Sequence, residues 1–147
     1  MKSLDEAAPE LGVSLVPIDM KSADDLESAF AKIKNSDVGA VLEIAGALTF
    51  NLGAETADHA LGAHLPLCSA FRETVMAGGL VSLGPDLVAM ARQAAVHVDK
   101  IIKGAKPADI PVEQPTRYDL YINLKTARLL NLTIPPTLFA RADEVIE

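Results

Sequence analysis

The sequence predicts an α/β fold with three layers and a mostly parallel sheet. Short apolar runs alternate along the chain with longer segments of helical periodicity, as at 38–45 and then at 50–63. This alternation is typical of βαβ units, in which helices cover each strand. Of the 147 residues, 50% are hydrophobic, which is enough for the buried core of one domain of ordinary size.

The N-terminal part begins with helical character. The stretch "LDEAAPELG" looks like the end of a helix, 12–19 predicts a strand near an edge because it contains Pro17, and 22–35 predicts a helix capped by Ser22. One face of that helix gathers Leu26, Ala29, Phe30 and Ile33. A doubly wound lobe normally opens with its central strand, so we expect that a first strand is absent.

Three apolar runs in the middle of the chain predict short buried strands. They lie at 38–45, 65–70 and 80–83, and the first is nearly continuous, as expected for a strand covered on both faces. Between the first two runs, 50–63 predicts a helix. Its apolar face consists of Phe50, Ala54, Ala57 and Leu61.

The clearest helix of the sequence follows Pro85. Asp86 is placed to cap its first N–H groups, and Gly104 is placed to end it. The predicted apolar face consists of Leu87, Ala91, Ala94, Val98 and Ile101.

The C-terminal part has a different composition. The proline-rich stretch 106–115 predicts an extended connector, and 118–123 alternates like a half-buried strand. Asn123 is placed to cap a short helix through Leu130. A last helix is predicted from Pro136, with a stripe of Leu138, Ala142 and Val145. We therefore divide the chain into an α/β lobe at 1–105 and a connecting segment at 106–147.

Composition excludes several classes of function. A formal net charge of −7 and the absence of Trp argue against nucleic acid or an anionic membrane as a partner. The lone cysteine, Cys68, excludes an internal disulfide and a multi-cysteine zinc site. The N-terminus lacks the features of a signal peptide, and no apolar run has the length that crosses a bilayer, so the chain as written is expected to be cytoplasmic.

No motif of nucleotide binding or nucleophilic catalysis is present. His59, His64 and His97 do not fall at metal-ligand spacings, so we expect no metal and no cofactor. Cys68 lies in a predicted buried strand. We expect it to be a core residue and not a nucleophile, because burial raises the pKa of a thiol and so lowers its reactivity. Glu43 lies inside an apolar run, where we expect it to face outward or to form an ion pair, with a ligand contact as the alternative.

The topology selects the candidate binding residues. Ligands of open parallel sheets bind at the C-terminal ends of the strands, which here are the loops 45–51, 69–73 and 82–86. Their hydroxyl, amide, guanidinium and backbone groups suit hydrogen bonding to a small polar molecule and provide no evident base or nucleophile. The candidates are Ala47, Thr49, Asn51, Ser69, Arg72, Ser82, Gly84 and Asp86.

Two stretches resemble a known family. "GGLVSLGPDL" and "KGAKPADIPVEQPT", with "INLKTA", "LTIPP" and "RADEVI" after them, are similar to the C-terminal part of the ABC-transporter substrate-binding proteins of the tryptophan/tyrosine type. The resemblance covers nearly the whole chain. It implies one lobe of a type I periplasmic binding protein fold, in which two lobes close on a solute and dock on a membrane permease.

The resemblance also implies a function and partners. The chain would be a partial solute-binding component without catalysis, for a small polar or amino-acid-like ligand whose carboxylate meets Arg72 or the helix start at 84–86. Leu83 stands where the family commonly has Tyr, and Asn131 where a glycine is usual. The implied partners are the missing N-terminal lobe and the permease, and the implied location is the periplasm. Because the absent strand leaves backbone edges free, we also expect a homodimer.

Two other classes remain open. The effector-sensing lobe of a regulator has a similar fold, although no basic helix-turn-helix pattern accompanies it here. A flavodoxin-like or Rossmann-type enzyme domain would need phosphate-binding glycines or a titratable cluster, and neither is seen.

Overall fold

A computed structural model describes residues 2–147 of the chain. The chain divides into two compact units, one that ends at Gly39 and one that spans Ala40–Glu147. None of the helices in residues 2–147 combines the length and the apolar character that crossing a bilayer requires. From the sequence we divide the chain at residue 105 into a lobe and a connecting segment. That division stays a prediction.

The first unit is helical. It contains α1 (Lys2–Glu10), the 3-10 helix η1 (Ala23–Asp25) and α2 (Leu26–Lys34), so the predicted helix at 22–35 is confirmed. The carboxylate of Asp25 accepts hydrogen bonds from the backbone N–H groups of Lys21 at 2.8 Å and Ser22 at 3.0 Å, which fixes the start of this helix. The predicted apolar stripe of α2 is buried in full: Leu26, Ala29, Phe30 and Ile33.

The strand predicted at 12–19 is wrong. This segment has no regular secondary structure, and Val13, Leu15 and Val16 are exposed. A strand is held by hydrogen bonds to a neighbouring strand, and no strand of the described residues pairs with this segment. The apolar residues of this segment were therefore insufficient to form a strand without a partner.

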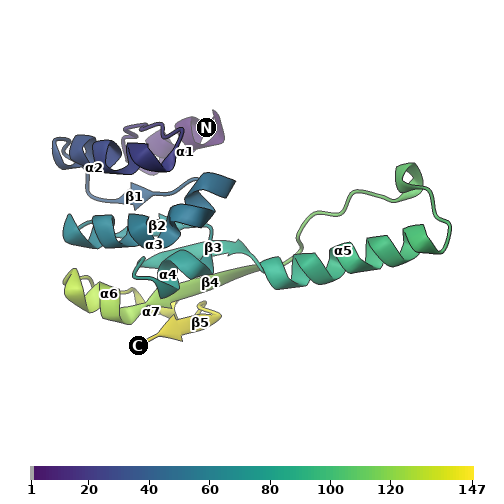
Figure 1. Ribbon diagram of the computed structural model, residues 1–147. Helices are drawn as coiled ribbons and strands as arrows, with labels where there is room; N and C mark the ends of the chain where they lie inside the picture. Colours follow the sequence, from purple (N-terminus) through teal and green to yellow (C-terminus); the bar gives the residue numbers. More distant parts are fainter. Residues whose placement is uncertain (1) are drawn as a thin grey trace. The chain divides into compact units, whose positions relative to one another are not determined.

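The second unit contains a five-stranded, mostly parallel sheet, as predicted (Figure 1). Its strands are β1 (Val41–Leu42), β2 (Leu67–Ser69), β3 (Val81–Pro85), β4 (Tyr118–Asn123) and β5 (Glu144–Ile146), in that order across the sheet. The β3–β4 pair is antiparallel and the other three pairs are parallel. The helices are α3 (Ala47–Gly62), α4 (Arg72–Met76), α5 (Leu87–Ile102), α6 (Leu124–Leu129) and α7 (Pro136–Phe139), with the 3-10 helix η2 (Pro107–Asp109) after α5.

Polar side chains inside the core tie the helices to the sheet. Asn123 caps α6 as predicted, because its Oδ1 accepts a hydrogen bond from the Thr126 backbone N–H at 2.9 Å. Its Nδ2 donates to the carbonyl of Val75 in α4 at 2.9 Å. Val75 and Ile122 are fully buried beside these groups. One residue therefore connects the end of β4 to two helices, which fixes the position of α4.

Strand β1 departs from the prediction. The apolar run 38–45 forms only a two-residue strand, and Leu42 and Ile44 are 49% and 50% exposed. Strand β1 pairs with β2 alone among the described strands, so the run lacks the second neighbour and the second covering layer that its composition favours.

The last predicted helix is also partly wrong. Helix α7 ends at Phe139, and Val145 lies in β5, which pairs with β4. The backbone of Asp143 donates to the carbonyl of Leu120 at 2.9 Å, and its carboxylate accepts from the Leu120 N–H at 2.8 Å. The free edge of β4 thus captures this segment as a strand, because pairing satisfies backbone groups of both.

Helix α5 begins and ends where the sequence indicates. Asp86 is its N-cap, and Gly104 follows it with a φ of +100°. Its predicted apolar face is not buried, however, since no residue of α5 is buried. Figure 1 shows α5 running away from the sheet of the second unit, with the segment 103–117 returning to β4.

Candidate functional site

A small pocket lies at the ends of the central strands of the second unit. It has a volume of about 20 Å³, which is room for roughly one water-sized group. It lies where β2 and β3 end and where α4 and α5 begin, the position predicted from the topology. We call it the strand-end pocket. Its lining residues are Ala70, Phe71, Arg72, Glu73, Ser82, Gly84, Pro85, Asp86, Leu87, Val88, Asp119 and Tyr121.

The antiparallel pairing of β3 with β4 builds the floor of the pocket. Ser82 lies opposite Tyr121 and Gly84 lies opposite Asp119. Residues directly opposite each other, and two apart along a strand, share one face of the sheet, so these four residues meet on the same face. The Ser82 side chain is buried, and its hydroxyl has no hydrogen-bond partner among residues 2–147. A buried hydroxyl without a partner is costly, so this group is ready to accept a ligand or a water.

Gly84 lets the pocket close. A Cβ atom at this position would lie 1.8 Å from the carbonyl oxygen of Ala70, in the loop between β2 and α4. That loop therefore crosses β3 at a distance that only glycine permits.

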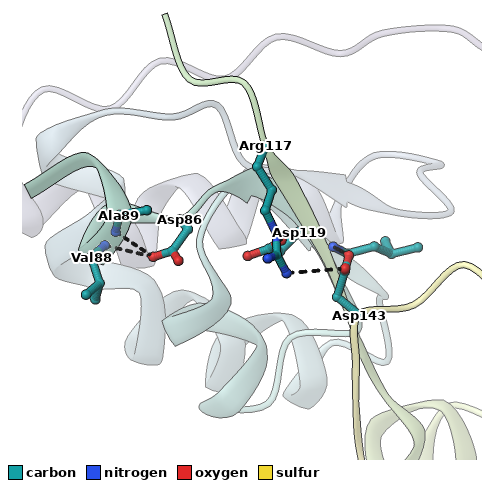
Figure 2. A network of polar contacts seen from close by, with 7 residues as sticks. Asp86, Val88, Ala89, Arg117, Asp119 and Asp143 are labelled. Carbon is teal, nitrogen blue, oxygen red and sulfur yellow. Dashed lines mark hydrogen bonds and ion pairs between the residues drawn. The ribbon is translucent and has the colours of Figure 1, made fainter. Parts of the chain in front are cut away.

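Asp86 uses one of its oxygens to hold the start of α5. Its Oδ1 accepts from the backbone N–H of Val88 at 2.9 Å and of Ala89 at 3.1 Å, so the predicted capping role is confirmed (Figure 2). These bonds, that of Ala89 first, hold the pKa of Asp86 below its ordinary value, and Arg72 and Arg92 add to the effect. Two N–H groups at this helix start are thus occupied by a protein carboxylate, so a ligand carboxylate has less to bind there than predicted.

Arg72 is the cation that lines the pocket. Its side chain is 45% exposed, and its Nε lies 3.3 Å from Glu73 Oε1. The hydroxyl of Tyr121, and after it the carboxylate of Glu73, raise the pKa of Arg72. The guanidinium is therefore held between β4 and α4 at the pocket mouth with part of its surface open to solvent.

A second charged group includes Asp119, a residue of β4 that lines the pocket with its carboxylate paired outside it. Arg117 Nε pairs with Asp119 Oδ1, and Arg117 Nη2 lies 3.6 Å from Asp143 Oδ1 (Figure 2). Asp119 is buried, so its carboxylate depends on this pairing. Asp86 also acts on Arg117, whose pKa is raised first by Asp119. The charged residues that line the pocket are thus one cation, Arg72, and three acids, Glu73, Asp86 and Asp119.

The structure gathers half of the predicted site residues. Arg72, Ser82, Gly84 and Asp86 line the strand-end pocket. The other four are Ala47, Thr49, Asn51 and Ser69, and none of them is among its lining residues. Ala47 and Asn51 are exposed on the first turns of α3. The Thr49 hydroxyl lies 2.9 Å from the Ile44 carbonyl and 3.0 Å from that of Gly46, so it stabilises the start of α3.

Ser69 has a role inside the protein. Its hydroxyl donates to Glu43 Oε2 at 2.5 Å and accepts from the Phe71 backbone N–H at 3.1 Å. Phe71 then packs edge-on against Phe50 of α3 with ring centroids 5.0 Å apart. Ser69 therefore shapes the loop that carries Phe71 and Arg72.

The expectation for Glu43 is wrong. Glu43 is only 7% exposed and forms no ion pair within the described part of the chain; its partners are the hydroxyls of Ser69 and Thr74, the latter at 3.4 Å. Its Oε1 is buried and has no hydrogen-bond partner among the described residues. Burial raises the pKa of this carboxyl above its ordinary value. The hydroxyls of Ser69 and Thr74 thus allow the carboxyl of Glu43, at the end of β1, to be buried, although the sequence pattern predicts that it faces solvent.

Sequence reasoning missed Phe71, Asp119 and Tyr121. The alternation of 118–123 gave a signal for the strand, but the pairing of β4 with β3 that brings Asp119 and Tyr121 to the pocket depends on a register that alternation does not specify. Cys68 is partly buried, and burial raises the pKa of its thiol. Within residues 2–147 no group of three or more His, Cys, Asp or Glu side chains is placed to hold a metal ion.

Solved structures share this fold. A conserved domain protein from Vibrio cholerae matches at 26% identity with a TM-score of 0.91, over 98% of this chain and 48% of that one. The ABC domain from Streptococcus pneumonia in complex with L-Trp matches at 22% identity with a TM-score of 0.88, over 99% of this chain and 51% of that one. The ligand-free, open form of a substrate-binding protein with adhesive properties from Clostridium difficile matches at 16% identity with a TM-score of 0.66, over 99% of this chain and 48% of that one.

The chain spans about half the length of these solved relatives. No curated protein matches the sequence. Residues 1–146 match the family described as ABC transporter substrate binding protein. That match covers nearly the whole sequence and agrees with the resemblance carried by the proline-rich C-terminal segment. The chain therefore belongs to the ABC transporter substrate-binding protein family.

Proposed function

We propose that this chain binds a small polar or amino-acid-like solute without transforming it, as one half of a transporter's solute-binding component. The observation that carries the proposal is the strand-end pocket, where Arg72, Asp86 and the unpartnered hydroxyl of Ser82 meet at one strand end. These groups bind by hydrogen bonds and charge. The pocket lining contains no histidine, cysteine or lysine, and of its carboxylates Asp86 caps α5 and Asp119 pairs with Arg117.

The size of the pocket limits what it holds. A volume of about 20 Å³ accommodates one polar group and not a whole amino acid. The rest of the solute would extend toward Ala47 and Asn51 at the exposed start of α3 and toward a second lobe. This division of the ligand is consistent with a chain that spans half the length of its solved relatives.

An amino-acid-like solute is supported by one relative and by the pocket itself. The similar domain from Streptococcus pneumonia was solved in complex with L-Trp. In the pocket described here, the partly exposed guanidinium of Arg72 suits a carboxylate, and the free Oδ2 of Asp86 suits an ammonium group.

The proposed partners follow from the family. They are an N-terminal lobe that completes the binding cleft, and a membrane permease that receives the solute in the periplasm. A second copy of the chain is a further proposed partner.

Chemical-shift perturbation in ¹H–¹⁵N NMR spectra tests the proposal, because it detects the weak binding expected of half a site. Titration with the standard amino acids, L-Trp first, should shift the backbone amides of Phe71, Arg72 and Val88 saturably. Arg72→Gln should weaken the response about ten-fold, whereas Arg128→Gln, an exposed change on α6, should leave it intact.

Other outcomes contradict the proposal. Saturable shifts with flavin or nucleotides, and none with amino acids, would favour an enzyme domain. Shifts only with sugars or nucleobases would favour an effector-sensing lobe.

A further inference from the structure

The strand-end pocket has room for one polar group of a solute, and the charges around it decide which group that is. An amino-acid-like solute offers an ammonium group, which only donates hydrogen bonds, or a carboxylate, which only accepts them. The pocket has a volume of about 20 Å³, so it takes one of the two groups and leaves the other outside. The partners of each charged residue at the pocket therefore distinguish the two orientations.

The two cations described at the pocket already have carboxylate partners. Arg72 Nε lies 3.3 Å from Glu73 Oε1. Arg117, which is not among the lining residues, pairs with Asp119, and its Nη2 lies 3.6 Å from Asp143 Oδ1. A solute carboxylate inside the pocket would therefore compete with carboxylates of the protein for these guanidinium groups.

Asp86 is the charged lining residue that lacks such a partner. Within residues 2–147 it forms no ion pair, and its Oδ1 accepts from the backbone N–H groups of Val88 and Ala89 (Figure 2). These bonds, that of Ala89 first, hold the pKa of Asp86 below its ordinary value, so its carboxylate is charged at neutral pH. The second oxygen, Oδ2, is free to accept from a cation.

The start of α5 is unfavourable for an anion. Two N–H groups of its first turn already donate to Asp86, and the Asp86 carboxylate would repel a second carboxylate placed beside it. The same negative charge attracts an ammonium group. The helix start that the sequence suggests for a solute carboxylate therefore favours the opposite end of the solute.

Ser82 indicates independently that a polar group belongs in the pocket. It is 1% exposed and lines the pocket, and its hydroxyl has no hydrogen-bond partner in the described part of the chain. A hydroxyl both donates and accepts, so it pairs with an ammonium group or with a carboxylate. Ser82 thus points to a polar ligand group, and the charge of Asp86 decides the sign of that group.

We propose that the ammonium group of the solute enters the strand-end pocket, where it donates to Asp86 Oδ2 and to the hydroxyl of Ser82. A carboxylate, if the solute has one, stays at the pocket mouth beside Arg72, whose side chain is 45% exposed. The solutes of this site are then primary amines, with or without a carboxylate, and acids without an ammonium group are excluded. This inference rests on the proposed function and adds to it the group by which the solute is recognised.

Two analogues of one amino acid test the orientation by the same NMR titration. The amino acid that binds, with L-Trp tried first, is compared with its amide, which lacks the carboxylate, and with its des-amino acid, which lacks the ammonium group. For L-Trp these are L-tryptophanamide and indole-3-propionate. The amide should bind within about ten-fold of the amino acid. The des-amino acid should bind at least about a hundred-fold more weakly, because it makes no charge-assisted hydrogen bond to Asp86.

The other outcomes separate this inference from the proposed function. Equal binding of the two analogues, or tighter binding of the des-amino acid, would overturn the orientation and leave the proposed function intact. Failure of every amino acid to bind would overturn the proposed function and this inference with it.

Asp86→Asn tests the site in the protein. This variant keeps an acceptor oxygen for the cap of α5 and removes the charge, so it should weaken binding of the amide at least about ten-fold with an unchanged circular dichroism spectrum. Asp99→Asn is the matched control, because it is the same change on the same helix, beside Lys103 and about 20 Å from Asp86. It should leave binding within about two-fold, since salt screens a charge at that distance. Equal effects of the two variants would overturn the role of Asp86.

Discussion

At the strand-end pocket, polar residues are buried and apolar residues support them, whereas α5 exposes apolar residues along its whole length. Ser82 and Asp119 are 1% and 6% exposed, while Val98 and Ile102 are 54% and 79% exposed. Both regions belong to the second unit and are joined at Asp86. The groups at the strand ends are thus held in place by contacts within the second unit, whereas the apolar face of α5 is not covered by the rest of that unit.

The largest expected effect separates the core under the pocket from α5. Ile122→Ala removes a fully buried side chain of β4 and should lower the free energy of unfolding by about 3–4 kcal/mol. Val98→Ala on α5 should change it by about 0.5 kcal/mol or less when the protein is dilute enough to be monomeric. Urea unfolding followed by circular dichroism measures both. Equal losses would mean that α5 is buried in the monomer.

Gly84→Ala tests how tightly the pocket is closed. The new Cβ would meet the Ala70 carbonyl oxygen at 1.8 Å, so the loop must move, at a cost of about 2–3 kcal/mol in the free energy of unfolding. Gly62→Ala is the matched control, because nothing lies within 4 Å of the added Cβ at the last residue of α3. It should stabilise the protein by about 0.5 kcal/mol. Destabilisation of the same size by both variants would contradict the close approach at Gly84.

Asp86 lies between the two regions. Two variants of this residue separate the effect of its capping hydrogen bonds on stability from the effect of its charge. Asp86→Ala removes the acceptor of the Val88 and Ala89 N–H bonds and should lower the Tm by about 3 °C. Asp86→Asn keeps an acceptor oxygen at the same place and should leave the Tm nearly unchanged. A scanning calorimeter distinguishes the two results. An equal loss in both variants would show that the charge, not the cap, stabilises α5.

The smallest of these effects on the free energy of unfolding is expected from Glu43→Gln, and it increases as pH rises. Because burial raises the pKa of Glu43 in the folded protein, folding favours the protonated form. The stability that this carboxyl contributes is complete below its unfolded pKa and is lost as pH rises through the raised folded pKa. Glu43→Gln, which carries no charge at any pH, should therefore gain stability relative to wild type as pH rises.

Urea midpoints between about pH 4 and pH 8 measure this difference, starting near the ordinary pKa of a glutamate. Glu55→Gln, an exposed change on α3, is the control and should follow the wild-type curve. If Glu43→Gln follows it too, the carboxyl of Glu43 is solvated in the folded protein and not buried beside Ser69 and Thr74.

Most of the fold was predictable because local patterns carry it. Helix α2, α5, the caps at Asp86 and Asn123, and strands β2 to β4 follow from apolar spacing and capping residues within a few positions of each other. That the loops 69–73 and 82–86 meet at one pocket was predictable from topology alone. Segments whose state depends on a distant partner were not. Residues 12–19 have a strand pattern and no strand to pair with, and Val145 has a helical pattern but is captured by β4.

Patterns along the chain were enough to predict most of the helices and strands, the family, and the residues at the strand ends, because each depends on neighbours along the chain or on their order. Three features became visible only in the folded chain: Asp119 and Tyr121 reach the pocket, Glu43 is buried beside two hydroxyls, and the apolar face of α5 lies open. These outcomes depend on register and on which surfaces meet. Such contacts join residues far apart in the chain, and periodicity within one segment carries no information about them.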